Sequence, residues 1–153
     1  MDIEARLKEL GFTLPEPPQP VAAYVPAVQV GDLLFLSGTT CYKDGEFLFT
    51  GRVGAELTIE QGYIAARQTA LNLLSVIKAT LGSLERVERV VKLNGYVNCA
   101  PDFDRQPEVI NGASELLQEL YGERGKHART AIGVSDLPAH IPVEIELIVQ
   151  VNS

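Results

Sequence analysis

The chain has 153 residues, 46% of them hydrophobic and 22% charged, which is the composition of one ordinary globular domain. This composition excludes a disordered, coiled-coil or collagen-like chain. The net charge of −7 disfavours nucleic acid as a partner, and the apolar runs, such as Leu33–Leu36, are too short to span a bilayer. The acidic N-terminus lacks the basic and apolar pattern of a leader, so we expect a cytoplasmic protein with no membrane contact.

The sequence has no recognisable motif for a metal or an organic cofactor. Cys41 and Cys99 are too few for a disulfide scaffold and have no zinc-ligand spacing, and their role as nucleophiles or as small buried thiols stays open. His127 and His140 do not pair as metal ligands. No phosphate-binding loop or dinucleotide fingerprint is present, so we expect no metal and no organic cofactor.

The N-terminal residues predict an extension of the main domain. A short amphipathic helix is predicted over residues 3–10, ending at Gly11, and four prolines in residues 15–20 predict a stiff, extended connector. We interpret the helix as an appendage. The chain is therefore divided into an extension over residues 1–20 and a domain over residues 21–153.

The first strands of that domain predict an antiparallel meander. After residue 21, a strand that ends near Val30 is joined to a strand over residues 33–37 by the turn-forming pair Gly31 and Asp32. Another turn signal precedes a third strand over residues 46–50.

The middle of the chain predicts two helices separated by a strand over residues 87–97. Thr58 and Gln61 have the spacing of a capping box, and the helix that they begin ends at Gly82. Pro107 suits the first position of the second helix, because its φ is fixed and it has no N–H.

The last two strands are predicted over residues 130–134 and 143–151. In the final strand, apolar residues alternate with polar ones, which indicates that one face of the sheet is buried. The order of elements predicts a single α+β domain in which two helices cover one face of a sheet.

Two sets of charged residues are candidates for chemistry. Arg129 lies in a basic segment at the start of an apolar strand, where it either clamps a carboxylate by two parallel hydrogen bonds or pairs with a surface acid. Glu144 and Glu146 share one strand face and form either a general base with a raised pKa or a solvated surface. Ile148 continues that face, which suggests that another subunit covers one end of it.

Three polar residues are weaker candidates. Tyr24, Ser37 and Asn111 can each orient a small ligand by hydrogen bonds, or can be satisfied locally or by solvent.

The segments Leu36-Ser37-Gly38, Ala128-Arg129-Thr130-Ala131 and Leu137-Pro138, with Val143-Glu144-Ile145-Glu146, resemble the RidA (YjgF) family over roughly residues 21–151. The resemblance implies a chorismate-mutase-like fold with a mixed β-sheet, a homotrimer, and active sites in clefts between subunits. It also implies hydrolysis of 2-imino or enamine acids to 2-keto acids and ammonia.

By position, the resemblance gives Arg129 the role of holding the substrate carboxylate and Glu144 that of activating water. Tyr24 and Ser37 match substrate-binding residues of the family, and Asn111 matches another if one residue is inserted before Arg129. Ala131 stands where many relatives have a cysteine, so that only its backbone can contact substrate. The longer segment 38–58 and the N-terminal helix also depart from the short archetype.

We keep three hypotheses for function. The first is a 2-imino acid deaminase that needs only to fix a carboxylate, place a water and move protons. The second is a non-catalytic trimer that binds a small carboxylate metabolite. The third is a ribonuclease, which the charge of −7 disfavours.

Overall fold

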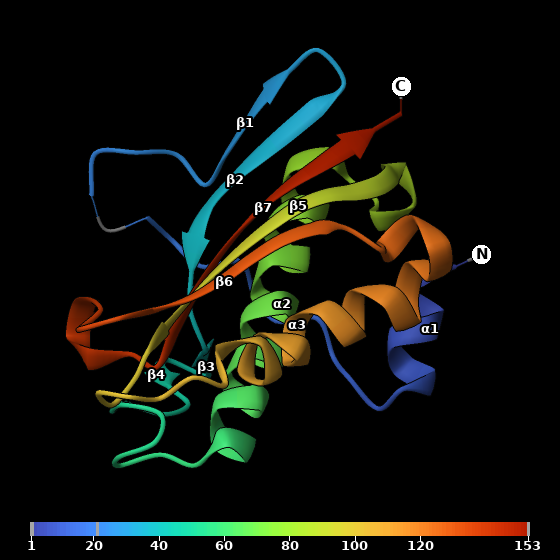
Figure 1. Cartoon of the computed structure of the whole chain (residues 1–153). Coiled ribbons are helices and arrows are strands. Elements are labelled where there is room, and N and C mark those ends of the chain that lie inside the picture. Colours follow the sequence, from blue (N-terminus) through green and yellow to red (C-terminus); the bar gives the residue numbers. More distant parts are fainter. Residues whose placement is uncertain (1, 21, 153) are drawn as a thin grey trace.

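The fold is organised around one twisted sheet, seen in a computed structural model that describes residues 2–20 and 22–152 (Figure 1). Within those residues, five strands form the sheet in the order β1-β2-β7-β5-β6. Their bounds are Ala27–Val30 for β1, Leu33–Thr39 for β2, Val87–Asn98 for β5, Ala128–Val134 for β6 and Val143–Val151 for β7. All neighbouring strands are antiparallel except β5 and β6, which are parallel, so the predicted mixed sheet is confirmed.

Two long helices pack against one face of this sheet. They are α2 (Ile59–Leu81) and α3 (Gln106–Tyr121), which also pack against each other. In β7, Val143, Ile145, Leu147, Val149 and Val151 point towards these helices and are buried, as the alternating sequence predicts. The alternate residues of β7, from Glu144 to Gln150, point to the opposite face of the sheet, which we call the open face. No helix in the described part of the chain is both long and apolar enough to cross a membrane.

The N-terminal helix is not an appendage, which corrects our interpretation of it. In α1 (Ile3–Glu9), Ile3 and Leu7 are buried in the same hydrophobic core as α2 and α3, and Glu4 pairs with Lys78 of α2 at 2.7 Å. A helix of seven residues is unstable alone, so this burial stabilises it. Val21, where we place the start of the main domain, lies outside the described residues, and the division there stays a prediction.

The hairpin of β1 and β2 is confirmed, and a third strand does begin at Glu46, but it is shorter than predicted and does not continue the meander. Instead, β3 (Tyr42–Lys43) and β4 (Glu46–Phe47) form a small separate hairpin. Two physical reasons account for this. The second neighbour of β2 is β7, which leaves no free edge, and Asn72 of α2 donates to the carbonyls of Thr40 and Tyr42 at 2.7 and 2.8 Å.

Helix α2 begins with the predicted capping box. The Thr58 hydroxyl accepts from the Gln61 N–H at 3.1 Å, and the Gln61 side chain accepts from the Thr58 N–H at 2.9 Å. We expect Thr58→Ala to lower the free energy of unfolding by about 1 kcal/mol, or about 2–4 °C in Tm for a chain of this size. Thermal melts measure this shift. Thr80→Ala, at an exposed position in the last turn of the same helix, is the control and should melt like the parent protein.

Two of the boundaries that differ from the prediction bear on the candidate site. Helix α3 begins at Gln106, with Pro107 in its first turn, and β6 begins at Ala128 instead of residue 130. The strand starts earlier because its parallel pairing with β5 already begins at Lys92 and Ala128. Arg129 therefore lies inside the strand, where the register fixes the direction of its side chain.

Candidate active site

Arg129 lies on the edge strand of the sheet, with its side chain on the face that the helices cover. It pairs in register with Leu93, which is buried on that face. Its Nη1 donates to Asn111 Oδ1 at 2.7 Å and to Ser114 Oγ at 3.2 Å, both on α3. Two acceptors one helical turn apart therefore hold the guanidinium between β6 and α3.

The positive charge of Arg129 has no protein counter-ion. Among the described residues, no carboxylate lies within ion-pair distance of it, and Nε and Nη2 donate no hydrogen bond. Burial lowers the pKa of Arg129, although a guanidinium stays charged at all relevant pH values. The free edge of the guanidinium matches a carboxylate, which accepts two parallel hydrogen bonds.

The Arg129 side chain lines a cavity at the protein surface. The cavity has a volume of about 340 Å³, and its lining side chains are all polar: Asn111, Ser114, Glu115, Gln118, His127 and Arg129. We call Arg129, Asn111, Ser114 and His127 the arginine half-site.

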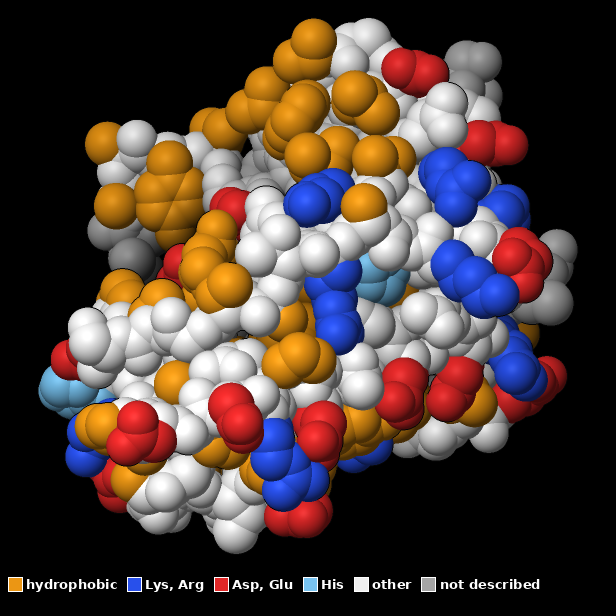
Figure 2. Space-filling view, in the orientation of Figure 1, with side chains coloured by type: hydrophobic (Ala, Val, Ile, Leu, Met, Phe, Trp, Pro, Cys, Tyr) orange, Lys and Arg blue, Asp and Glu red, His pale blue; other side chains and the backbone are white. Residues whose placement is uncertain are grey.

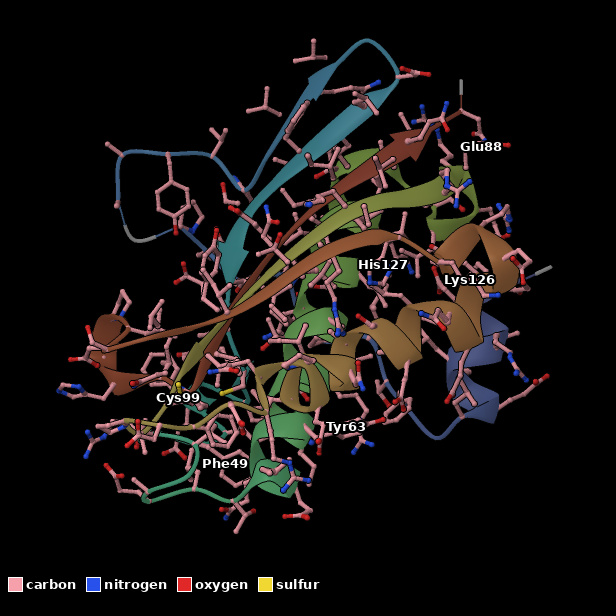
Figure 3. All side chains as sticks on the ribbon, in the orientation of Figure 1. Phe49, Tyr63, Glu88, Cys99, Lys126 and His127 are labelled. Carbon is pink, nitrogen blue, oxygen red and sulfur yellow. The ribbon has the colours of Figure 1, made fainter. Side chains whose placement is uncertain are left out.

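Sequence reasoning missed Ser114, and it placed His127 only in the basic segment before Arg129, without its contact to Ser114. The Ser114 hydroxyl lies 2.9 Å from His127 Nε2, and Figure 3 shows the His127 side chain between β6 and α3. A signal was present for both. Ser114 follows Asn111 by three residues on one helix face, and His127 precedes Arg129 by two residues, which places both side chains on the same side of an extended chain.

The open face carries the second set of charged residues. Glu146 accepts from Asn94 Nδ2 at 3.1 Å and from the Tyr96 hydroxyl at 3.0 Å, whereas the Glu144 carboxylate accepts no hydrogen bond from the described residues. Burial, and secondly the charge of Glu146, raise the pKa of Glu144. The expected like-charge effect is present, but burial is the larger cause. A raised pKa suits a general base.

Gly38, which follows Ser37 in β2, lies against the Glu144 side chain. A Cβ added to Gly38 would lie 3.1 Å from Glu144 Oε2, so this glycine allows the carboxylate to approach the backbone closely. The Ser37 hydroxyl donates to the carbonyl of Val25 at 2.6 Å, which ties it to the segment that carries the exposed Tyr24. We call Glu144, Glu146, Ser37 and Gly38 the glutamate half-site.

The predicted site is not assembled within a single chain. The arginine half-site lies on the helix-covered face, and the glutamate half-site lies on the open face, so the sheet separates Arg129 from Glu144. Ala131 lies on the same side as Arg129 and packs against the hydrophobic core. The two catalytic residues implied by the resemblance can act together only if two copies of the chain meet.

The open face also exposes apolar side chains. Val28, Phe35 and Ile132 are 50%, 40% and 46% exposed, and Phe35 pairs in register with both Val28 and Ile148. Figure 2 shows hydrophobic side chains gathered over β1 and β2. Exposed apolar surface of this kind is typical of protein–protein interfaces.

The cysteines lie outside both half-sites. Cys41 is buried, and Cys99 is partly buried next to Gln106 of α3. His140 is exposed and pairs with Asp136 at 3.0 Å. The described residues contain no group of three His, Cys, Asp or Glu side chains placed to hold a metal ion.

A mixed sheet covered on one face by two long helices defines an α+β fold of the chorismate-mutase-like type. The chain belongs to the YjgF family, to which RidA belongs. The family model, described as "YjgF/chorismate mutase-like, putative endoribonuclease", matches residues 4–146. The predicted family membership is thus confirmed, and the match includes most of α1.

Known relatives extend over nearly the whole chain. Protein TCP17 of Trypanosoma cruzi is 43% identical over 99% of this chain and 95% of its own length. A 2-iminobutanoate/2-iminopropanoate deaminase of Dermatophagoides farinae is 32% identical over 92% of this chain and 95% of its own length. The crystal structure of a protein of unknown function from Agrobacterium tumefaciens has a TM-score of 0.93 and 45% identity, covering 98% of this chain and 92% of that one.

Proposed function

We propose that this protein hydrolyses reactive 2-imino acids to 2-keto acids and ammonia. The observation that carries the proposal is Arg129, a partly buried cation held by two neutral acceptors, with a free edge in a cavity and no counter-ion among the described residues. An unpaired, partly desolvated charge favours binding of an anion. The deaminase relative at 32% identity supports an imino acid as that anion.

We further propose that the active site forms between copies of the chain in a homotrimer. The edge strand β6 of one copy would meet the open face of the next, so that Arg129 of the first faces Glu144 of the second. The apolar residues Val28, Phe35 and Ile132 of the open face support such an interface. A shared site also accounts for the placement of the half-sites on opposite faces of the sheet.

The two half-sites supply complementary steps of the hydrolysis. Arg129 holds the substrate carboxylate, which fixes the position of the neighbouring imine carbon. Glu144 accepts a proton from water as the oxygen attacks the carbon of the protonated imine, which gives a neutral carbinolamine. Glu144 returns this proton to the amino nitrogen and the carbon–nitrogen bond breaks. Ammonia leaves, while the hydroxyl oxygen passes its proton through Glu144 to solvent and becomes the carbonyl of the keto acid.

The test is the rate at which ammonia and 2-oxobutanoate form from 2-iminobutanoate generated in situ by an amino-acid oxidase. We expect acceleration that depends on the concentration of the protein, and a kcat/KM that falls at acidic pH. Because the base form of Glu144 is the carboxylate and its pKa is raised, activity is present above that raised pKa and is lost as pH falls through it. Tight binding of 2-oxobutanoate without any acceleration would replace this proposal by the non-catalytic carboxylate-binding trimer.

A further inference from the structure

A chain of hydrogen bonds extends from Arg129 along the wall of the cavity. Arg129 Nη1 donates to Ser114 Oγ at 3.2 Å, Ser114 Oγ lies 2.9 Å from His127 Nε2, and His127 Nδ1 lies 2.7 Å from the carbonyl oxygen of Gly125. The chain joins β6, α3 and the 3₁₀ turn Gly122–Gly125 that follows α3.

The chemistry of these groups fixes the direction of every hydrogen bond in the chain. A backbone carbonyl only accepts, so Nδ1 of His127 carries the proton. In the neutral ring Nε2 is then the acceptor, and the Ser114 hydroxyl donates its proton to it. The Ser114 oxygen therefore presents its lone pairs to Arg129, which can only donate.

We propose that His127 and Ser114 are positioning residues that fix the Arg129 guanidinium for the substrate carboxylate, with His127 neutral and protonated on Nδ1. Asn111 and Ser114 accept from Nη1, and His127 orients the Ser114 hydroxyl, which leaves Nε and Nη2 aligned for a bidentate carboxylate. This inference rests on the proposed function and deepens it, because it identifies residues that preorganise the site.

The surroundings of His127 favour the neutral ring. Burial is the largest effect on its pKa and lowers it; the hydrogen bond to Gly125 opposes this as the second-largest effect, and the charge of Arg129 lowers the pKa further. The other nearby charged groups are Glu115 of α3, which lines the same cavity, and Lys126, which pairs with Glu123 at 2.7 Å. A protonated ring would donate from Nε2 and so remove the acceptor of the Ser114 hydroxyl.

The tautomer is tested directly by ¹⁵N NMR of the ring nitrogens. The chain has two histidines, so His140→Gln assigns the signals of His127. At pH 7.5 we expect a protonated Nδ1 and an unprotonated Nε2 that accepts a hydrogen bond, and we expect Ser114→Ala to shift the Nε2 signal. A proton on Nε2, or an Nε2 signal that Ser114→Ala leaves unchanged, would overturn the inference.

The positioning role is tested by the affinity for 2-oxobutanoate and by the split between KM and kcat. Ser114→Ala and His127→Phe should each weaken binding and raise KM about 5–10-fold, as expected for the loss of one ordinary hydrogen bond that positions Arg129, with a smaller change in kcat. Because both changes break one chain, the double variant should lose little more than either single variant. His127→Gln, which offers a carbonyl acceptor, should restore part of the affinity.

The matched control is Ser75→Ala, which removes a buried helix hydroxyl that bonds only the carbonyl of Asn72 in its own helix. Its affinity for 2-oxobutanoate should equal that of the parent. Additive losses in the double variant, or full affinity in Ser114→Ala, would contradict the positioning role. A parent protein that does not bind 2-oxobutanoate would count against the proposed function instead, while the NMR experiment would still decide the inference.

Discussion

Replacing Arg129 by alanine should lower kcat/KM for 2-iminobutanoate by about 100-fold or more, which corresponds to about 2.7 kcal/mol of lost transition-state stabilisation. The guanidinium is the cation that lines the cavity with a free edge, and α3 already holds it in place. Arg129→Lys should recover only part of the activity, because an ammonium group keeps the charge but lacks the planar fork. Steady-state rates of 2-oxobutanoate formation measure both effects.

The control for this prediction is Arg105→Ala. Arg105 lies just before α3 and pairs on the surface with Glu108 at 2.6 Å, so its removal changes the net charge equally without touching the cavity. Exposed pairs of this kind contribute little to stability. We expect near-parental activity from this variant. Near-parental turnover by Arg129→Ala would refute the role assigned to Arg129.

Sequence patterns predicted local structure well where one physical signal dominates. The capping box at Thr58 and the alternation from Val143 to Val151 depend on short-range spacing, and both are confirmed. The separate β3–β4 hairpin was not predictable in this way, because it depends on Asn72, a residue of α2 that captures two distant carbonyls. The burial of Ile3 likewise depends on a surface that forms only when the chain has folded.

The candidate site shows the same division between local and long-range information. Family resemblance named Arg129, Asn111, Ser37 and Glu144, and the structure joins Arg129 to Asn111 while it places Glu144 beside the Ser37–Gly38 segment. Sequence alone could not show that these pairs lie on opposite faces, because that follows from the parallel register of β6 on β5. The support of Arg129 by Ser114 and His127 also requires three elements to be in place.

Replacing Glu144 by glutamine should lower kcat by about 100-fold or more with little change in KM, because the amide cannot accept the proton of the attacking water. The carboxylate is well suited to that step, since Glu146 takes the donors of Asn94 and Tyr96 and leaves Glu144 free. Glu88→Gln is the matched control, since Glu88 is an exposed residue near the start of β5 and lies outside both half-sites (Figure 3). A kcat that stays near the parental value in Glu144→Gln would show that another group activates the water.

Co-expression of the two inactive variants tests the shared site itself. An interface that joins Arg129 of a Glu144→Gln chain to Glu144 of an Arg129→Ala chain carries both functional residues. Random mixing in equal amounts makes about one quarter of the interfaces intact in a closed ring, so the mixture should recover about 25% of the parental activity. If both residues act within one chain, no chain in the mixture has a complete site and activity stays at the level of the single variants. The separation of the half-sites by the sheet favours the first result.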